Sequence, residues 1–192
     1  MIRIIGYGIQ WTWVAFGILW LIAALTSKRS IRVQSSGSRL FQSCLLILGI
    51  MLMSNFRNWI TNGWLTIRLM PVTLPVFAGG AALTLAGLLF CVWARVVLGT
   101  NWSGTVTIKE NHELIVRGPY QIVRHPIYTG LLFALTGTAF LDGYVRSFVG
   151  VLVIGFSLWL KSQTEEQFMV QQFGGQYIDY RQHVRALIPF VL

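Results

Sequence analysis

The sequence predicts an all-α integral membrane protein with about five transmembrane helices. Its 192 residues are 55% hydrophobic and only 11% charged, whereas soluble domains carry roughly 25% charged residues. Five apolar runs approach the length of about 20 residues that a helix needs to cross a bilayer. The longest segments outside these runs are 95–126 and 161–192. Any chemistry therefore belongs to those two segments.

The apolar runs differ in length and in how they are joined. The first contains no charged side chain and is the clearest span. The last two are short, and only residues 142–146 separate them, so they predict a tight helical hairpin that takes up loop residues for length. The five runs are Ile4–Leu25, Phe41–Phe56, Pro71–Ala94, Ile127–Leu141 and Ser147–Leu160.

The basic residues indicate the topology. Lys28, Arg29 and Arg32 follow the first span, and Lys and Arg in short loops stay cytoplasmic, so the N-terminus is expected outside. Five crossings then place both polar segments in the cytoplasm. The net charge is +9, and the basic residues border apolar spans. This placement favours anionic membrane lipids as partners and not nucleic acid. Cys44 and Cys91 lack paired spacing, so we expect core cysteines and no metal site.

The densest polar cluster lies in the stretch Gly118–Gly130, which places Tyr120, Arg124, His125 and Tyr128 before the fourth span. Pro126 favours a helix start at this point, because proline suits the first turn and the preceding residue avoids helical dihedrals. One interpretation is structural: arginine snorkels to phosphates, histidine caps the helix and tyrosine joins an interfacial belt. The other is a binding site.

A second polar cluster follows the fifth span, in a segment of helical character. Lys161 precedes Glu165 by one helical turn, so both project from one face. A surface ion pair ending a membrane helix would explain this pattern. Against that interpretation, Glu165 and Glu166 lie close to the acyl boundary, where a carboxylate is costly unless it binds something.

These motifs together resemble one protein family. The elements G-P-Y, R-H-P-I-Y, E-E and F-G-x-x-Y-x-x-Y occur in this order across a helical hairpin, after a Leu-Gly-x-Asn-Trp-Ser turn at residues 98–103. The combination resembles the isoprenylcysteine carboxyl methyltransferases and the related phospholipid methyltransferases, over Leu98 to Pro189. The turn is similar to that of prokaryotic members, so the resemblance implies a prokaryotic cell membrane.

The resemblance implies an S-adenosylmethionine pocket on the cytoplasmic side. It divides the chain into transmembrane helices 1–3 (1–94) and a catalytic region (95–192) with a cofactor loop, a transmembrane hairpin (127–160) and a cytoplasmic C-terminal helix. Lys161, Glu165, Glu166 and Arg124 would be catalytic, with Lys161 contacting the substrate where many members carry arginine. The implied cofactor-binding residues are His112, Glu113, Leu114, Ile115, Tyr120, His125, Pro126, Ile127, Tyr128 and Glu165.

These residue types suit the cofactor. A sulfonium cation is attracted to aromatic faces such as Tyr120 or Tyr128, and an amino group pairs with a carboxylate such as Glu165. Methyl transfer is an in-line displacement that needs alignment and desolvation, with no metal. Lys161 attracts a carboxylate but lacks the planar two-point grip of arginine.

The preferred function is a carboxyl O-methyltransferase for a lipophilic or prenylated acceptor, which would enter from the bilayer between the fourth and fifth spans. Phosphatidylethanolamine N-methylation, which needs a base such as Glu166 or His125, and methylation of a small hydrophobic thiol are alternatives. A non-catalytic membrane scaffold or carrier is the alternative outside enzymes. The joint presence of Tyr120, His125, Tyr128 and Glu165 favours the enzyme.

Overall fold

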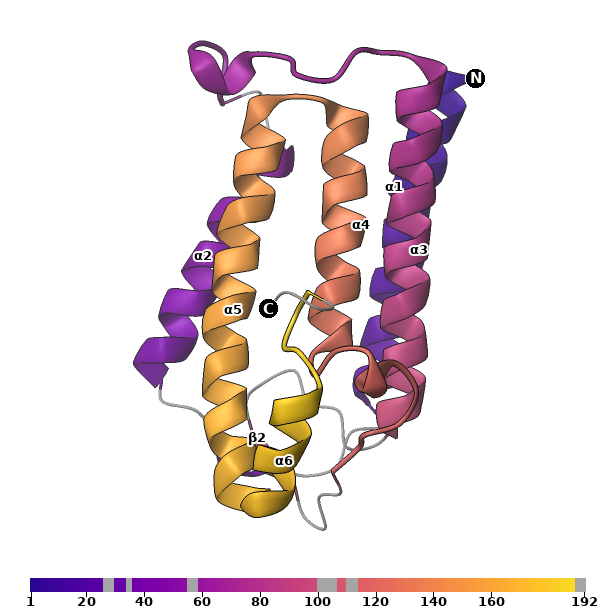
Figure 1. Cartoon of the computed structure of the whole chain (residues 1–192). Coiled ribbons are helices and arrows are strands. Elements are labelled where there is room, and N and C mark those ends of the chain that lie inside the picture. Colours follow the sequence, from indigo (N-terminus) through magenta and orange to yellow (C-terminus); the bar gives the residue numbers. More distant parts are fainter. Residues whose placement is uncertain (26–29, 34–35, 55–58, 100–106, 110–113, 189–192) are drawn as a thin grey trace.

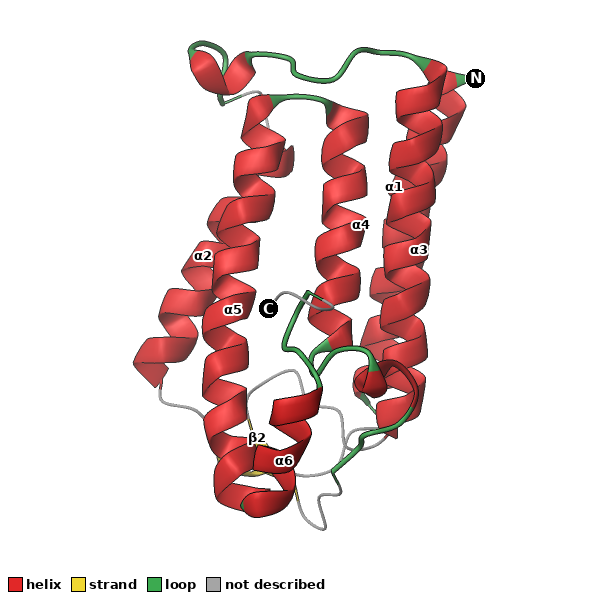
Figure 2. Ribbon diagram, viewed as in Figure 1, coloured by secondary structure: helices red, strands yellow, loops and turns green. Residues whose placement is uncertain are grey.

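The computed structural model describes residues 1–25, 30–33, 36–54, 59–99, 107–109 and 114–188. Figure 1 shows long helices running side by side, with a short helix α6, Gly175–His183, at the polar end. Helices make up nearly all of the regular structure in the described part of the chain (Figure 2). The long helices are α1 (Ile2–Ala24), α2 (Ser36–Ser54), α3 (Leu74–Leu98), α4 (Pro126–Asp142) and α5 (Val145–Phe173).

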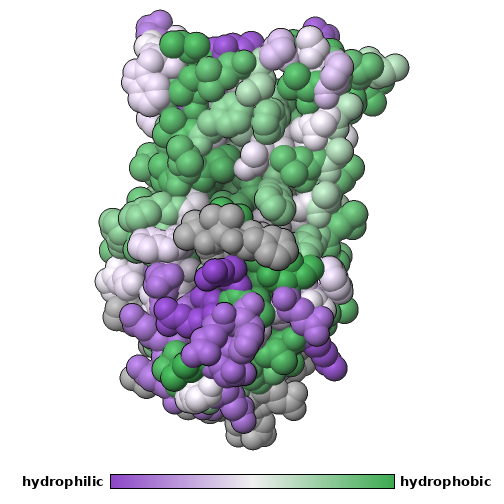
Figure 3. Space-filling model, viewed as in Figure 1, coloured by the Kyte–Doolittle hydropathy of each residue, from purple (hydrophilic) through white to green (hydrophobic). Residues whose placement is uncertain are grey.

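The protein is an integral membrane protein of the predicted all-helical class. Helices α1, α2, α3 and α5 are long and apolar enough to cross a membrane. Helix α4 has 17 residues, about 25 Å at 1.5 Å per residue, which is shorter than the hydrocarbon core of about 30 Å. On the face in Figure 3, apolar side chains cover most of the middle and upper part below a hydrophilic top edge, and the largest hydrophilic area lies at the lower end near α6.

Several helix boundaries differ from the sequence prediction; α2, for example, begins at Ser36 and not at Phe41, and α3 ends at Leu98 and not at Ala94. Helix α3 begins at Leu74, not at Pro71, because Thr73 is extended and Pro75 takes the favoured place in the first turn. Helix α5 continues to Phe173, well beyond the predicted end at Leu160, and stops where Gly174 adopts a φ of 54°. The intervening residues are mostly Gln, Glu, Met and Lys, which favour helix. The polar segment after the fifth span is thus the continuation of a membrane helix.

The predicted hairpin of α4 and α5 is present, and its connection is very short. Gly143 adopts a left-handed conformation, φ 78° and ψ 2°, and its carbonyl accepts hydrogen bonds from the amides of Leu69 (2.7 Å) and Met70 (3.1 Å). Asp142 still belongs to α4 and Arg146 to the first turn of α5, and the two form an ion pair of 2.6 Å. The predicted loop residues therefore lengthen the helices.

Glycines allow α3 to pack closely against α4. A Cβ atom on Gly87 would lie 2.5 Å from the carbonyl oxygen of Gly130, and one on Gly137 would lie 2.5 Å from that of Gly80. Small residues let membrane helices approach in this way. Helices α2 and α5 meet similarly, since a Cβ on Gly150 would lie 2.7 Å from the Gly49 carbonyl. Each limb of the hairpin thus has its own close partner.

A small sheet lies at the polar end of the molecule. Strand β1, Ser30–Val33, pairs antiparallel with β2, Thr107–Lys109, with Ser30 opposite Lys109. The extended piece predicted over 105–109 is thereby confirmed for its described part, 107–109. Its partner strand was not predicted, because pairing over this sequence separation leaves no local pattern. One further expectation was wrong: Cys91 is buried, but Cys44 is exposed on the surface of α2.

Candidate active site at the start of α4

The stretch before α4 folds as a short 3₁₀ helix, η4, Gly118–Gln121. Gly118 has a φ of 61°, a conformation that favours glycine. Pro119 and Tyr120 are buried behind it, and Tyr120 packs with Ala94 and Ile127. Tyr180 of α6 donates a hydrogen bond of 2.5 Å to the Tyr120 carbonyl. This network fixes η4 against both α3 and α6.

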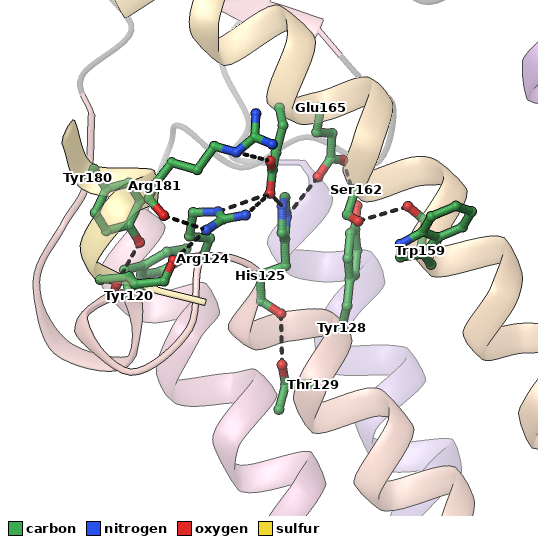
Figure 4. Close-up of polar contacts among 12 residues, drawn as sticks. Tyr120, Arg124, His125, Tyr128, Thr129, Trp159, Ser162, Glu165, Tyr180 and Arg181 are labelled. Atoms are coloured by element: carbon green, nitrogen blue, oxygen red, sulfur yellow. Dashed lines mark hydrogen bonds and ion pairs between the residues drawn. The ribbon is translucent and has the colours of Figure 1, made fainter. Parts of the chain in front are cut away.

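His125 is the N-cap of α4, and Pro126 occupies the first turn, as the sequence predicted. The imidazole stacks on the ring of Tyr128 one turn later, with centroids 5.4 Å apart and planes within 3° of parallel. His125 is also nearly covered, since its side chain is 9% exposed. The turn into the helix thus presents an ordered pair of aromatic rings to α5 (Figure 4).

Glu165 approaches these two rings from α5. The Tyr128 hydroxyl donates a hydrogen bond of 2.5 Å to Glu165 Oε1, and His125 Nδ1 lies 3.3 Å from Glu165 Oε2 (Figure 4). The carboxylate remains 23% exposed. The Glu165 carboxylate is therefore held by Tyr128 and His125 and is still partly exposed to solvent.

Glu166 forms a more enclosed ion-pair network. Its Oε1 accepts hydrogen bonds from Arg124 Nε (2.9 Å) and Nη2 (2.6 Å), while Arg181 Nε lies 3.4 Å from Oε2. The Arg124 and Glu166 side chains are 8% and 4% exposed. Buried charges are tolerated when they are paired and hydrogen-bonded in this way. This pair holds α5 against the turn before α4.

His125 connects the two carboxylates, because its Nε2 lies 3.4 Å from Glu166 Oε1. Burial alone would lower the pKa of His125, but hydrogen bonds and charges from Glu165 and Glu166 outweigh burial and raise it above its ordinary value. In the protonated ring both nitrogens are donors, which matches a carboxylate at each. The imidazolium form therefore fits this position.

Lys161 lies one turn before Glu165 on α5, as predicted. Its Nζ is 5.5 Å from the centroid of the Tyr128 ring, within the range of a cation–π interaction. Tyr128 thus contacts a cation through its ring and donates a hydrogen bond to a carboxylate through its hydroxyl. Lys161, Tyr128 and Glu165 form the outer part of the site.

Most of the predicted site residues come together. Leu114 and Ile115 are half-buried, and Ile115 packs beside Tyr120 and Ile127. Pro126 and Ile127 are buried and support the turn. His112 and Glu113 lie outside the described residues. The residues brought together around α4 and α5 are Tyr120, Arg124, His125, Tyr128, Lys161, Glu165 and Glu166.

Sequence reasoning missed Arg181, which pairs with Glu166 across elements. A signal existed, because Arg181 directly follows the second tyrosine of the F-G-x-x-Y-x-x-Y motif. Sequence reasoning also missed Thr129, whose hydroxyl donates a hydrogen bond of 2.5 Å to the Leu187 carbonyl. No local pattern predicts that contact.

Comparison with known proteins places this chain in a class. The model of the phospholipid methyltransferase family matches residues 75–176, more than half of the chain, so the chain belongs to this family. The match includes α3 except Leu74, the site residues from Tyr120 to Glu166, and the whole of α5.

Within this class, the chain is similar to protein-S-isoprenylcysteine O-methyltransferases. It is 30% identical over 115 residues to enzyme B of Arabidopsis thaliana, covering 58% of each chain. It is 36% identical over 104 residues to that of Schizosaccharomyces pombe, covering 51% of this chain and 43% of that protein. The chain spans about half the length of these curated relatives.

A solved structure supports the fold. The eukaryotic intramembrane Ras methyltransferase ICMT (isoprenylcysteine carboxyl methyltransferase) matches with a TM-score of 0.50 and 21% identity. The match covers 83% of this chain and 55% of that one. The arrangement of membrane helices is therefore shared beyond the region that the family model matches.

Proposed function

We propose that this protein is an S-adenosylmethionine-dependent membrane methyltransferase that methylates the carboxylate of a lipophilic acceptor such as an isoprenylcysteine. The observation that carries the proposal is the Glu165–His125–Tyr128–Lys161 constellation, which lies where α5 leaves the apolar part of the molecule. The names of the relatives, which act on isoprenylcysteine, supply the acceptor class.

The residues present fit the cofactor. The Tyr128 ring already contacts an ammonium, that of Lys161, and a sulfonium is attracted by the same negative ring face. Glu165 keeps an open side and, among the described residues, has no guanidinium partner, unlike Glu166. Glu165 is therefore the carboxylate suited to an incoming amino group. We assign cofactor binding to Glu165, Tyr128, Tyr120, His125 and the apolar residues beside them.

The chemistry divides between the bound cofactor and the chain. When bound, S-adenosylmethionine supplies an electrophilic methyl group. The residues of the chain bind and align the reactants: Glu165 and Tyr128 orient the donor, and the buried Arg124–Glu166 pair keeps their supports in place. Alignment of two bound reactants is a large part of such catalysis.

The contacts of His125 and Glu166 favour a carboxylate over an amine as the acceptor. Methylation of an ammonium requires a base to remove a proton, whereas a carboxylate is already ionised. His125 has a raised pKa, since two carboxylates favour its charged form although burial opposes it. Glu166 is already occupied by two arginines. Both ring nitrogens of His125 lie beside a carboxylate, and Glu166 is paired with arginine, so neither is positioned to take a proton from an acceptor. The Lys161 ammonium adds a positive charge that attracts an anionic acceptor.

The topology of the protein is inferred from its basic residues. We place the active site on the cytoplasmic face with the N-terminus outside, because the basic segments flank the polar end. A prenylated acceptor would reach the site from the bilayer through the space between α4 and α5. Anionic lipids near the basic residues are the expected surroundings, and the membrane is that of a prokaryotic cell.

Calorimetry with S-adenosylmethionine on the detergent-solubilised protein tests the proposal. We expect saturable binding that is abolished in Glu165→Gln and His125→Ala but retained in Asp179→Asn, whose side chain is 76% exposed. No binding to a folded wild-type protein would contradict the proposal and favour a scaffold or carrier. Wild-type binding in both site variants would show that the site assignment is wrong.

Transfer assays separate the acceptors. With a radiolabelled methyl donor, N-acetyl-S-farnesylcysteine should be methylated, and phosphatidylethanolamine and a hydrophobic thiol should not. Lys161→Ala should impair transfer more than cofactor binding, so the acceptor KM should rise more than the cofactor Kd changes, and Lys161→Arg should restore transfer. If only the phospholipid or only the thiol were labelled, the acceptor group would be an amine or a thiol and not a carboxylate.

A further inference from the structure

The residues after α6 run back to the candidate active site. This segment, Val184–Leu187, is here called the C-terminal strap. In Figure 1 it rises from α6 toward the start of α4. Its last residue, Leu187, is only 5% exposed, whereas the next residue, Ile188, is 44% exposed. The strap is therefore anchored by one buried side chain.

The strap pairs with the backbone of the turn that carries the site. Val123 and Arg185 form a parallel bridge. The amide of Arg124 donates to the Arg185 carbonyl (2.8 Å), and that of His125 donates to the Ala186 carbonyl (3.0 Å). The two residues at the centre of the ion network are thus held by two successive strap carbonyls.

This pairing also fixes the backbone of the residue at which α4 begins. The first amides of a helix lack partners within the helix, and a polar side chain at the N-cap usually satisfies one of them. The N-cap of α4 is His125, and its side chain makes no capping hydrogen bond because the imidazole faces the carboxylates. The Ala186 carbonyl of the strap accepts the amide of His125 itself, so the strap holds the backbone of this residue while its ring faces the carboxylates.

Side chains extend the same connection. Arg124 Nη1 donates to the carbonyls of Val184 and Arg181, the latter at 3.2 Å. Thr129, one turn into α4, donates to the Leu187 carbonyl at 2.5 Å and lies 3.3 Å from the His125 carbonyl. Thr129 thus ties the end of the strap to the helix that His125 begins.

We infer that the C-terminal strap, fastened by Thr129, is a positioning element of the active site: it sets where His125 and Arg124 stand against Glu165 and Glu166. The strap touches the ion network through the backbone and the Arg124 guanidinium. Its relevance to catalysis rests on the proposed function, but its effect on His125 does not.

Thr129→Val tests the inference, because it keeps the shape of the side chain and removes its hydroxyl. Thr136→Val is the control on the same helix, since that hydroxyl bonds only the Leu132 carbonyl of its own helix among the contacts described. Thr129→Ser retains the hydroxyl. A second pair, Leu187→Ala with Ile188→Ala as control, loosens the strap without altering α4 and serves if Thr129→Val does not fold.

The primary readout is the imidazole pKa of His125, followed by NMR and assigned by loss of its signal in His125→Gln. The groups facing the ring are Glu165 and Glu166 from α5, Tyr128 from α4 and, through Glu166, Arg124 and Arg181. A loosened strap lets the ring move from the carboxylates, so the pKa should fall toward its ordinary value. Thr129→Ser and both controls should match the wild type.

The second readout is the S-adenosylmethionine Kd, which should rise roughly 2- to 10-fold in Thr129→Val, the effect expected from one lost hydrogen bond. Unchanged His125 titration in Thr129→Val and Leu187→Ala would overturn the inference. Equal shifts in the test and control variants would also overturn it, since they would indicate general loosening. If the wild type binds no cofactor, the proposed function fails while the titration still decides the role of the strap.

Discussion

Replacing Glu166 by glutamine should strongly destabilise the fold, because it removes the charge that balances a buried guanidinium. The Arg124 and Glu166 side chains are 8% and 4% exposed, and two guanidinium nitrogens donate to one carboxylate oxygen at 2.6 and 2.9 Å. Removing one partner of a buried ion pair costs about 3–5 kcal/mol. The contact with Arg181 adds little, since that side chain is 54% exposed.

The amide cannot reproduce these contacts. It offers one accepting oxygen, while its NH₂ group would face the donors of Arg181 or the protonated His125. A loss of about 3–5 kcal/mol corresponds to roughly two to four powers of ten in the folding equilibrium at about 1.4 kcal/mol per tenfold change.

Equilibrium unfolding in mixed detergent and SDS micelles, followed by tryptophan fluorescence, measures this loss. Asp179→Asn is the matched control, because its carboxylate is 76% exposed and a substitution at such a site stays within about 0.5 kcal/mol. If Glu166→Gln unfolds within about 1 kcal/mol of the control, then the pair does not hold α5 to the turn, and our reasoning about the site's rigidity fails.

Three further predictions concern packing, a buried hydrogen bond and pH. Gly87→Ala should cost about 1–3 kcal/mol in the same unfolding assay, since its Cβ would lie 2.5 Å from backbone atoms of α4, whereas Gly79→Ala meets nothing within 4 Å and should be neutral. Tyr180→Phe leaves the buried Tyr120 carbonyl without its 2.5 Å donor and should cost about 1–3 kcal/mol; an unchanged stability would argue that water replaces the hydroxyl. The raised pKa of His125 adds stability that is complete below its unfolded value of about 6.5 and is lost as pH rises through the folded value, so His125→Gln should flatten the stability profile over that window.

The sequence was sufficient for the membrane class and for several of the local features around the start of α4, while the roles of the site residues stay a prediction. Long uncharged runs need no tertiary context to be interpreted, and Pro126 correctly marked the first turn of α4. The one-turn spacing of Lys161 and Glu165 correctly placed both on one face of the helix, and the structure shows that this face meets Tyr128. These successes share a cause: each depends on residues that are close together along the chain.

The features that sequence reasoning missed depend on distant contacts. The pairing of Glu166 with Arg181 and the tie between Thr129 and Leu187 join segments that only the tertiary fold brings together. The end of α5 was misplaced at Leu160 because hydropathy changes there, although the helix itself continues to Phe173. A change from apolar to polar residues marks the membrane boundary, not the end of a helix.

Because α5 is unbroken, it fixes the distance between its first turn in the membrane and the carboxylate of Glu165. At 1.5 Å per residue, Glu165 stands about 30 Å along the axis from Val145, which is about the thickness of a hydrocarbon core. The helix has no hinge of proline over this length, so a shift at its outer end is carried to the carboxylates. In a thinner bilayer Glu165 would stand in water, and in a thicker one it would be drawn toward the acyl chains or force the helix to tilt. Membrane thickness is thus built into the geometry of the site.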